Sequence, residues 1–266
     1  MSPADEIVRS RANPLFKRLR ALRDRGVSGD GAICLLEGPR LIAEALEADV
    51  AVVEAAAAPE LEGRPPVRAV LATLRERGVP VRPMSRALLE SLSEADTPQG
   101  LVALARVPTF AEERLYDRIP LVLLAVGIQD PGNLGGLLRT AEAAGATGAW
   151  LAEGCAHPFS WKALRGSMGS AFRLPLARTT SAAEALDRLD AHGVRVIATA
   201  ADGESRYDAV DLKGPVALAV GNEGAGLPPE FRAFGQTVKI RQSADVDSYN
   251  LAVSAAIAMY AFTRPD

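Results

Sequence analysis

Apolar residues along the first hundred positions follow helical and strand spacings in turn. Between residues 13 and 25, Leu15, Leu19 and Leu22 recur three or four positions apart, and Gly26 ends the run, which predicts an amphipathic helix. Strands are predicted at 32–38, 49–56 and 101–107, a short extended piece at 79–84, and helices up to Leu46, at 67–77 and at 87–92. Residues 1–107 therefore predict a small α/β domain.

Beyond Pro120 the apolar runs become more continuous. They fall at 121–127, 148–152, 194–200 and 216–221, and helical patterns at 133–144, 160–168 and 181–191 separate them. Such strands alternating with helices are typical of a parallel sheet covered on both faces. Residues 120–266 thus predict a second α/β domain, and the charged stretch 108–119 predicts a linker.

The carboxyl ends of these strands are where a ligand site is expected. In open parallel sheets, ligands bind in the crevice beyond the strand ends. The loops that begin at Gly127, Ala200 and Gly221 are therefore the first candidates.

Length and composition agree with two globular domains and restrict the functional class. The 266 residues are 48% hydrophobic and 24% charged, which argues against disorder. A net charge of -3 argues against a nucleic-acid partner, and 5% aromatic residues disfavour binding of single strands by base stacking. The longest apolar run is too short to cross a membrane, and Cys34 and Cys155 follow no secretion signal, so we expect a cytoplasmic protein without a membrane segment.

The charge is nevertheless uneven along the chain. From residue 9 to residue 25 there are seven basic residues against one acid, Asp24. A charge run of this kind is commonly a solvated helix surface. It is also the pattern that binds a phosphate backbone, and the two interpretations remain open at this point.

Three segments after predicted strands contain residues that packing alone does not require. In the first, residues 130–132 form a turn and Asn133 is expected to cap the next helix. Gly135 and Gly136 cost that helix about 1 kcal/mol each relative to alanine. We therefore expect a ligand or another backbone to approach them closely.

Two polar residues of the first and second segments allow both a structural and a functional interpretation. Arg139 lies off the apolar stripe of its helix, and Glu223 lies in the glycine-rich turn that follows strand 216–221. Either can be an ordinary solvated side chain. The turn itself has backbone amides available to a polar ligand.

The third segment leads into the last predicted helix. Ser248 is expected to cap a helix over 251–262 that is apolar almost all round, which predicts burial on every side. One neighbour is the sheet, and a second subunit is a candidate for another. Asn250, in the first turn, needs a hydrogen-bond partner in such surroundings.

Other classes of site do not fit the sequence. There is no G-x-G-x-x-G after the 121–127 strand, no G-K-[ST] phosphate loop and no G-x-S-x-G elbow. His157 and His192, the two histidines, lie apart from the three segments, which argues against a catalytic triad or a zinc site. We expect no metal.

Three segments, taken in chain order, resemble the three signature motifs of the SpoU/TrmH branch of the SPOUT RNA methyltransferases. They are residues 133–145 (NLGGLLRTAEAAG), 221–227 (GNEGAGL) and 247–258 (DSYNLAVSAAIA). Residues 160–176 look like the stretch between the first two motifs. Residues 35–46 and 94–105 are similar to the substrate-binding domain that precedes the catalytic domain in ribosomal-RNA members. The resemblance covers nearly the whole chain.

The resemblance implies a fold and an activity. The C-terminal parallel-sheet SPOUT domain would contain a deep trefoil knot that holds S-adenosylmethionine, and a small α/β ribosomal-protein-like substrate-binding domain would precede it. The enzyme would be a homodimer that methylates a ribose 2'-hydroxyl of RNA, with ribosomal RNA favoured over transfer RNA. A non-catalytic RNA-binding protein with the same fold is the alternative from another class.

The family's site residues can be carried over where the motifs match. The catalytic set is Asn133, Arg139, Glu223 and Asn250. The expected cofactor-binding residues are Ala200, Gly221, Asn222, Glu223, Gly226, Ile240, Ser248, Tyr249 and Asn250. The basic run at residues 9–25, in the domain expected to hold RNA, adds further candidates, and the expected RNA-binding residues are Lys17, Arg18, Arg20, Arg40 and Arg139.

The sequence departs from the family pattern in two places. Residues 240–245 (IRQSAD) replace Ile-Pro-Met with a following Gly, and Tyr249 stands at a position that is usually Leu. Both departures concern the shape of the cofactor loop.

Arg139 is a poor base because the reference pKa of a guanidinium is above about 12. We therefore expect it to stabilise the developing alkoxide or to hold a phosphate, while an RNA phosphate or water accepts the proton. Asn133, Glu223 and Asn250 would orient RNA, Arg139 or the cofactor by hydrogen bonds.

Overall fold

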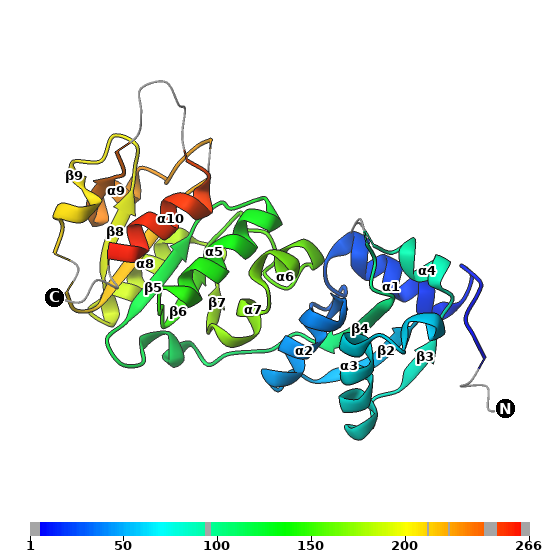
Figure 1. Cartoon of the computed structure of the whole chain (residues 1–266). Helices are drawn as coiled ribbons and strands as arrows, with labels where there is room; N and C mark the ends of the chain where they lie inside the picture. The colour runs from blue at the N-terminus through cyan, green and yellow to red at the C-terminus, as the bar shows by residue number, and fades with distance from the viewer. Residues whose placement is uncertain (1–5, 94–96, 212, 223, 242–248, 262–266) are drawn as a thin grey trace. The chain divides into compact units, whose positions relative to one another are not determined.

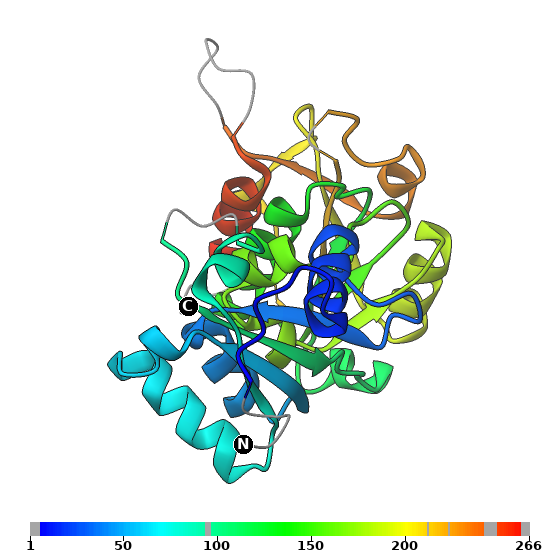
Figure 2. The same cartoon turned by 90° about the vertical axis from the view of Figure 1, so that its right-hand side faces the viewer.

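The computed structural model describes residues 6–93, 97–211, 213–222, 224–241 and 249–261. The chain forms two compact units (Figures 1 and 2). Unit 1 contains Met1–Pro108 and Phe159–Phe172, and unit 2 contains Thr109–Pro158 and Arg173–Asp266.

Unit 1 is built on a four-stranded sheet in the order β1-β4-β2-β3. β4 is antiparallel to both β1 and β2, and β3 is parallel to β2. The strands are β1 (Ile33–Glu37), β2 (Val52–Ala57), β3 (Val81–Pro83) and β4 (Leu101–Arg106), and the helices between them are α2 (Pro39–Glu47), α3 (Pro65–Glu76) and α4 (Arg86–Glu90). The predicted strands and helices of this region are confirmed, with small shifts at their ends.

Helix α1 (Pro14–Arg25) begins and ends where the sequence predicts. The Asn13 side chain accepts a hydrogen bond from the Leu15 amide and caps the helix, and Gly26 ends it. The buried stripe is Phe16, Leu19 and Leu22, whereas Leu15 is only half-buried. The basic residues between these positions therefore face solvent.

A segment from the later part of the chain completes unit 1. Helix α6 (Trp161–Ser167) and most of α7 (Ser170–Arg173) lie in this unit, and α6 packs on β1. Trp161 is buried in the core of unit 1, where its indole N–H donates to Glu37 Oε2 at 2.8 Å. The sequence assigned residues 120–266 to one domain; the structure differs because Trp161 fills a core position of unit 1.

Unit 2 contains a seven-stranded sheet in the order β7-β6-β5-β10-β8-β11-β9, in which every neighbouring pair is parallel. The predicted parallel sheet is thus confirmed. Its strands are β5 (Leu121–Ala125), β6 (Gly148–Leu151), β7 (Leu176–Arg178), β8 (Arg195–Thr199), β9 (Ser205–Arg206), β10 (Val216–Val220) and β11 (Gln236–Lys239). Strands β7, β9 and β11 were not predicted.

Helices cover both faces of this sheet (Figure 1). Val122 and Leu124 of β5 pack with Leu186 and Leu189 of α8 (Ala182–Ala191). Because strand side chains alternate between faces, the residues between them face α5 (Pro131–Ala143) and α10 (Leu251–Tyr260), which pack on each other. The short helix α9 (Glu230–Phe234) precedes β11.

Residues 109–119 belong to unit 2 rather than forming a free linker. A 3-10 turn at Glu112–Tyr116 places Leu115 in the core of unit 2. Tyr116 accepts a hydrogen bond from the Trp150 indole at 2.9 Å and stacks on His192, with ring centroids 3.6 Å apart. Burial of Leu115 explains why the expected linker is ordered here.

The last helix differs from the prediction in two respects. Asn250 is its N-cap, and Ser248 lies outside the described residues. Within one chain the helix is not buried on every side, because Val253 is 45% and Tyr260 64% exposed. The face toward α5 is tight: a Cβ on Gly136 would lie 3.2 Å from Ala252 Cβ, so α10 makes the close approach expected at this glycine.

The chain order of the sheet is interrupted in the middle, since β10 lies between β5 and β8. The path of residues 242–248, which the expected knot would involve, lies outside the described residues, and the knot stays a prediction. In the part of the chain that is described, no helix is long and apolar enough to cross a membrane.

Candidate functional site

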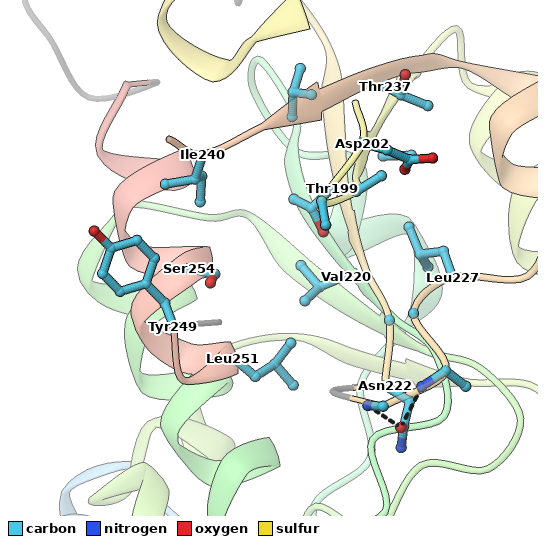
Figure 3. A pocket seen from close by; sticks show the side chains of 18 residues that line it. Thr199, Asp202, Val220, Asn222, Leu227, Thr237, Ile240, Tyr249, Leu251 and Ser254 are labelled. Atoms are coloured by element: carbon cyan, nitrogen blue, oxygen red, sulfur yellow. Dashed lines mark hydrogen bonds between the residues drawn. The ribbon is translucent and has the colours of Figure 1, made fainter. Parts of the chain in front are cut away.

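A cavity of about 320 Å³ opens at the carboxyl ends of β8, β10 and β11 (Figure 3). Its wall is formed by residues 198–202, 220–222, 224–227, 237, 238, 240, 249, 251 and 254. Six of the expected cofactor-binding residues line it: Ala200, Gly221, Asn222, Gly226, Ile240 and Tyr249. Glu223 and Ser248 lie outside the described residues, and Asn250 does not line the cavity.

The turn after β10 is closed so tightly that only glycine fits at its start. A Cβ on Gly221 would lie 2.3 Å from both the carbonyl carbon and the oxygen of Gly226. Gly226 itself has a φ of 69°, in the left-handed region that glycine adopts without strain. These two glycines therefore bring the two arms of the turn together beside the cavity.

Asn222 supports this turn with its side chain. Its Oδ1 accepts hydrogen bonds from the amides of Gly224, at 2.8 Å, and Ala225, at 3.2 Å, and its Nδ2 donates to the Gly127 carbonyl at 3.0 Å. The amide thus ties the turn after β10 to the loop after β5. This side chain therefore shapes the loop that lines the cavity, and the expected contact between Asn222 and the cofactor stays a prediction.

Several lining residues were not among the expected ones. They include Thr199, Asp202, Leu227, Thr237, Leu251 and Ser254. Thr199 comes directly before Ala200, and Asp202 lies two residues after it. Both therefore belong to the strand end and loop that the sequence predicts as a candidate ligand site. Thr237 lies on β11, which was not predicted as a strand.

Asn133 and Asn250 meet although 117 positions separate them. Asp130, not Asn133, caps α5: its carboxylate accepts the Asn133 amide at 2.7 Å, and Pro131 occupies the first helical position. The Asn133 side chain is thereby available to accept a hydrogen bond from Asn250 Nδ2, at 3.2 Å. Asn250 also accepts the Ala252 amide at 3.0 Å, which supplies the partner that the sequence required.

Arg139 is exposed on α5 and does not line the cavity. The structure thus joins two of the expected catalytic residues, Asn133 and Asn250, by a hydrogen bond and leaves Arg139 at the surface of the same helix that carries Asn133.

The loop after β6 carries a thiol and an imidazole whose pKa values are both shifted by burial. Burial raises the pKa of the Cys155 thiol above its usual value. Burial, together with the positive charge of Arg178, lowers the pKa of His157 to about 4. Near pH 7 this loop therefore presents a protonated thiol and a neutral imidazole. Among the described residues, no group of three or more His, Cys, Asp or Glu side chains could hold a metal ion.

Comparison with protein families defines the class of the chain. Residues 120–260 match the SpoU rRNA Methylase family, and residues 13–103 match the MRM3-like substrate binding domain. The chain belongs to the SpoU rRNA methylase family, as the three motifs predicted. The expected class of enzyme, an RNA ribose 2'-O-methyltransferase, is confirmed with it.

Individual relatives agree over most of the chain. It is 34% identical over 227 residues to the 23S rRNA (guanosine(2553)-2'-O)-methyltransferase RlmP of Bacillus subtilis, covering 85% of this chain and 86% of RlmP. It is 31% identical to the 23S rRNA (guanosine-2'-O-)-methyltransferase RlmB of Shewanella oneidensis, covering 70% of this chain and 79% of RlmB.

Solved structures show the same fold along nearly the full length. A crystal structure of an RNA 2'-O ribose methyltransferase has a TM-score of 0.82 and 36% identity, covering 97% of this chain and 98% of that one. An AdoMet-bound rRNA methyltransferase from Sinorhizobium meliloti has a TM-score of 0.84 and 31% identity, covering 97% of both chains.

Proposed function

We propose that this protein transfers the methyl group of S-adenosylmethionine to a ribose 2'-hydroxyl of 23S ribosomal RNA in the cytoplasm. The observation that carries the proposal is the cavity at the carboxyl ends of β8, β10 and β11, lined by residues of the second motif, of the third motif and of the loop at Ala200. RlmP and RlmB are named as 23S rRNA guanosine methyltransferases, which supports this choice of RNA.

The residues around the cavity fit the cofactor. A volume of about 320 Å³ is in the range of small-molecule sites, roughly 300–1,000 Å³. Val220, Leu227, Ile240 and Leu251 provide apolar surface, and the turn beside the cavity has no room for a side chain at Gly221. When bound, the cofactor supplies an electrophilic methyl group on a positively charged sulfur. The 220–227 turn, Ile240 and Leu251 would hold it.

The hydrogen-bonded pair Asn133 and Asn250 lies where α5 begins, and we assign it an orienting role. Arg139, on the exposed surface of α5, contacts the RNA: its guanidinium stabilises negative charge on the ribose oxygen as the proton leaves, or holds the adjacent phosphate. Glu223 keeps its expected place in the site as a prediction. Alignment of the hydroxyl with the methyl group accounts for much of the acceleration.

A second copy of the chain is proposed to cover the outer face of α10. Tyr249, Val253 and Tyr260 are 42%, 45% and 64% exposed, an unusual concentration of large apolar side chains on one helix and the residues just before it. Sedimentation of the purified protein should give twice the 28.0 kDa of one chain. A mass of one chain at micromolar concentration would contradict the homodimer.

The enzyme assay uses methyl-labelled S-adenosylmethionine with ribosomal or transfer RNA. Label should appear on ribose and in ribosomal RNA. Label confined to bases would contradict the proposed reaction, and label found in transfer RNA alone would identify transfer RNA as the substrate instead.

Arg139→Ala should lower turnover at least about 100-fold, because charge stabilisation at the reacting oxygen is lost. Arg188→Ala, an exposed arginine on α8, is the matched control and should retain activity.

A further inference from the structure

Arg165, on helix α6, holds its guanidinium against an aromatic ring of unit 1. Its Cζ lies over the Trp161 ring, 4.7 Å from the centroid, which is within the range of a cation–π contact. The arginine is nevertheless exposed to solvent. None of the hydrogen bonds and ion pairs found in the described part of the chain uses this guanidinium. A fixed positive charge with N–H donors still to be used therefore lies at the surface of unit 1.

Trp161 gives this arginine a rigid support. The indole is 3% exposed in the core of unit 1, and its N–H donates to Glu37 Oε2 at 2.8 Å. The other oxygen of Glu37 accepts a hydrogen bond from the Ser93 hydroxyl. The carboxylate behind the indole is thus held by neutral donors and not by Arg165. Because the ring cannot move, an arginine stacked on it loses less conformational entropy when it binds a ligand than a free surface arginine does.

The place of α6 in the chain indicates which ligand this charge serves. Helix α6 belongs to residues 120–260, which match the SpoU rRNA Methylase family, but it packs in unit 1, whose residues 13–103 match a substrate binding domain. The start of α6 also lies against the end of α1. A Cβ on Gly26, which ends α1, would be 2.9 Å from Ser160 Cβ, directly before α6. A second source of positive charge therefore lies next to the basic helix that is expected to bind RNA.

We propose that Arg165 binds a phosphate group of the RNA substrate and positions the RNA for methylation. The inference rests on the proposed function, since it takes RNA as the substrate. A guanidinium presents its N–H donors as a planar fork that matches two oxygens of one phosphate, and the Trp161 ring holds that fork in place. Arg165 does not line the cavity at the strand ends, so it acts by holding the RNA and not at the reacting ribose.

The test compares two substitutions that keep a long side chain over the indole. Arg165→Met removes the charge, whereas Arg165→Lys keeps the charge without the planar fork. Arg68→Met is the matched control, because Arg68 is an exposed arginine on α3 of the same unit. The probe is an unmodified transcript of 23S ribosomal RNA, which is used for filter binding across a salt series without cofactor and then for methylation kinetics.

Arg165→Met should bind the transcript about tenfold more weakly, as expected for the loss of a charged hydrogen bond at a surface. The slope of log affinity against log salt concentration should fall by about 0.7–0.9, the contribution of one phosphate contact. Arg165→Lys should keep the slope and recover part of the affinity. In the kinetics, Arg165→Met should raise KM by the same factor as it weakens binding and leave kcat within about twofold, because only binding of the RNA changes. Arg68→Met should behave as the unmodified chain does.

Four results would overturn the assignment. Unchanged affinity and KM in Arg165→Met would remove Arg165 from RNA binding. Weaker binding with an unchanged salt slope would place the guanidinium on an unstacked base instead of a phosphate. A lower kcat with unchanged KM would assign Arg165 to the reaction itself. An equal loss of stability to urea in Arg165→Met and Arg165→Lys, with unchanged RNA binding, would make the arginine a structural cover of Trp161.

Failure of the proposed function has a different signature. In that case the unmodified chain transfers no methyl group to the transcript. The binding comparison does not use the cofactor, so it decides the role of Arg165 separately.

Discussion

At the scale of single residues, Gly221 is the position where one added carbon should matter most. A Cβ there would lie 2.3 Å from the Gly226 backbone, which cannot yield without opening the turn. We expect Gly221→Ala to lower the free energy of unfolding by about 1–3 kcal/mol, as overpacking does, and to weaken S-adenosylmethionine binding at least about tenfold. Gly224→Ala is the control, since the nearest atom to its Cβ is 3.5 Å away. Denaturant unfolding and calorimetry compare the two, and equal affinities would contradict the role given to Gly221.

Local sequence patterns identify the loops of the site but not all of its contacts. Ala200 and Gly221 were found because each follows a continuous apolar strand, at the place where parallel sheets bind ligands. Asn133 was assigned as a cap because asparagine caps helices well, yet Asp130 takes that role once Pro131 begins the helix. The partner of Asn133 is Asn250, 117 positions later, and no local pattern connects the two.

At the scale of elements, the strands that the sequence predicts in unit 2 are the central ones. β5, β6, β8 and β10 have four or five residues each, and at least three consecutive residues of each are buried, so their apolar runs are continuous. β7, β9 and β11 have three, two and four residues and contain exposed positions, which leaves no run to recognise. Their pairing with longer neighbours, rather than their own composition, makes them strands.

Helix α1 is the element at which charge and RNA binding can be tested. Lys17, Arg18 and Arg20 are exposed, and the helix contains one acid, Asp24. Changing all three basic residues to alanine should weaken RNA binding and reduce the slope of log affinity against log salt concentration by about 2 to 3, as each lost phosphate contact contributes about 0.7–0.9. Filter binding across a salt series gives the slope.

The control for this test is the same charge change on α3, at its exposed residues Arg64, Arg68 and Arg75, of which Arg64 precedes the helix. It should leave the slope within about one unit of the unmodified chain. If both triple variants reduce the slope equally, RNA binding depends on overall charge, and α1 is not the contact surface. The net charge of -3 for the whole chain does not decide the matter, because it averages α1 with a more acidic remainder.

At the scale of the whole molecule, the sequence predicts two α/β domains, and the structure has two α/β units. One segment that the sequence assigns to the second domain lies in unit 1. Residues 159–172 follow β6 in sequence and pack in unit 1. Trp161 hydrogen bonds with Glu37, 124 positions away. Sequence reasoning assigns a segment to its neighbours in the chain, so it could not find this exchange.

The first 108 residues should therefore not form a stable domain by themselves. Trp161 is 3% exposed and lies in the core of unit 1 with Phe16, Leu19 and Leu35, so its removal leaves a cavity lined by apolar side chains. Loss of a buried tryptophan costs about 3–5 kcal/mol, much of the stability of a domain of this size.

Residues 1–108 joined by a flexible linker to 159–172 should unfold cooperatively in urea, whereas residues 1–108 alone should bind a hydrophobic dye and unfold broadly. The joined fragment with Trp161→Ala should behave as residues 1–108 do, because the indole, rather than the added length, completes the core. Equal cooperative midpoints for residues 1–108 and the joined fragment would show that unit 1 folds without the later segment.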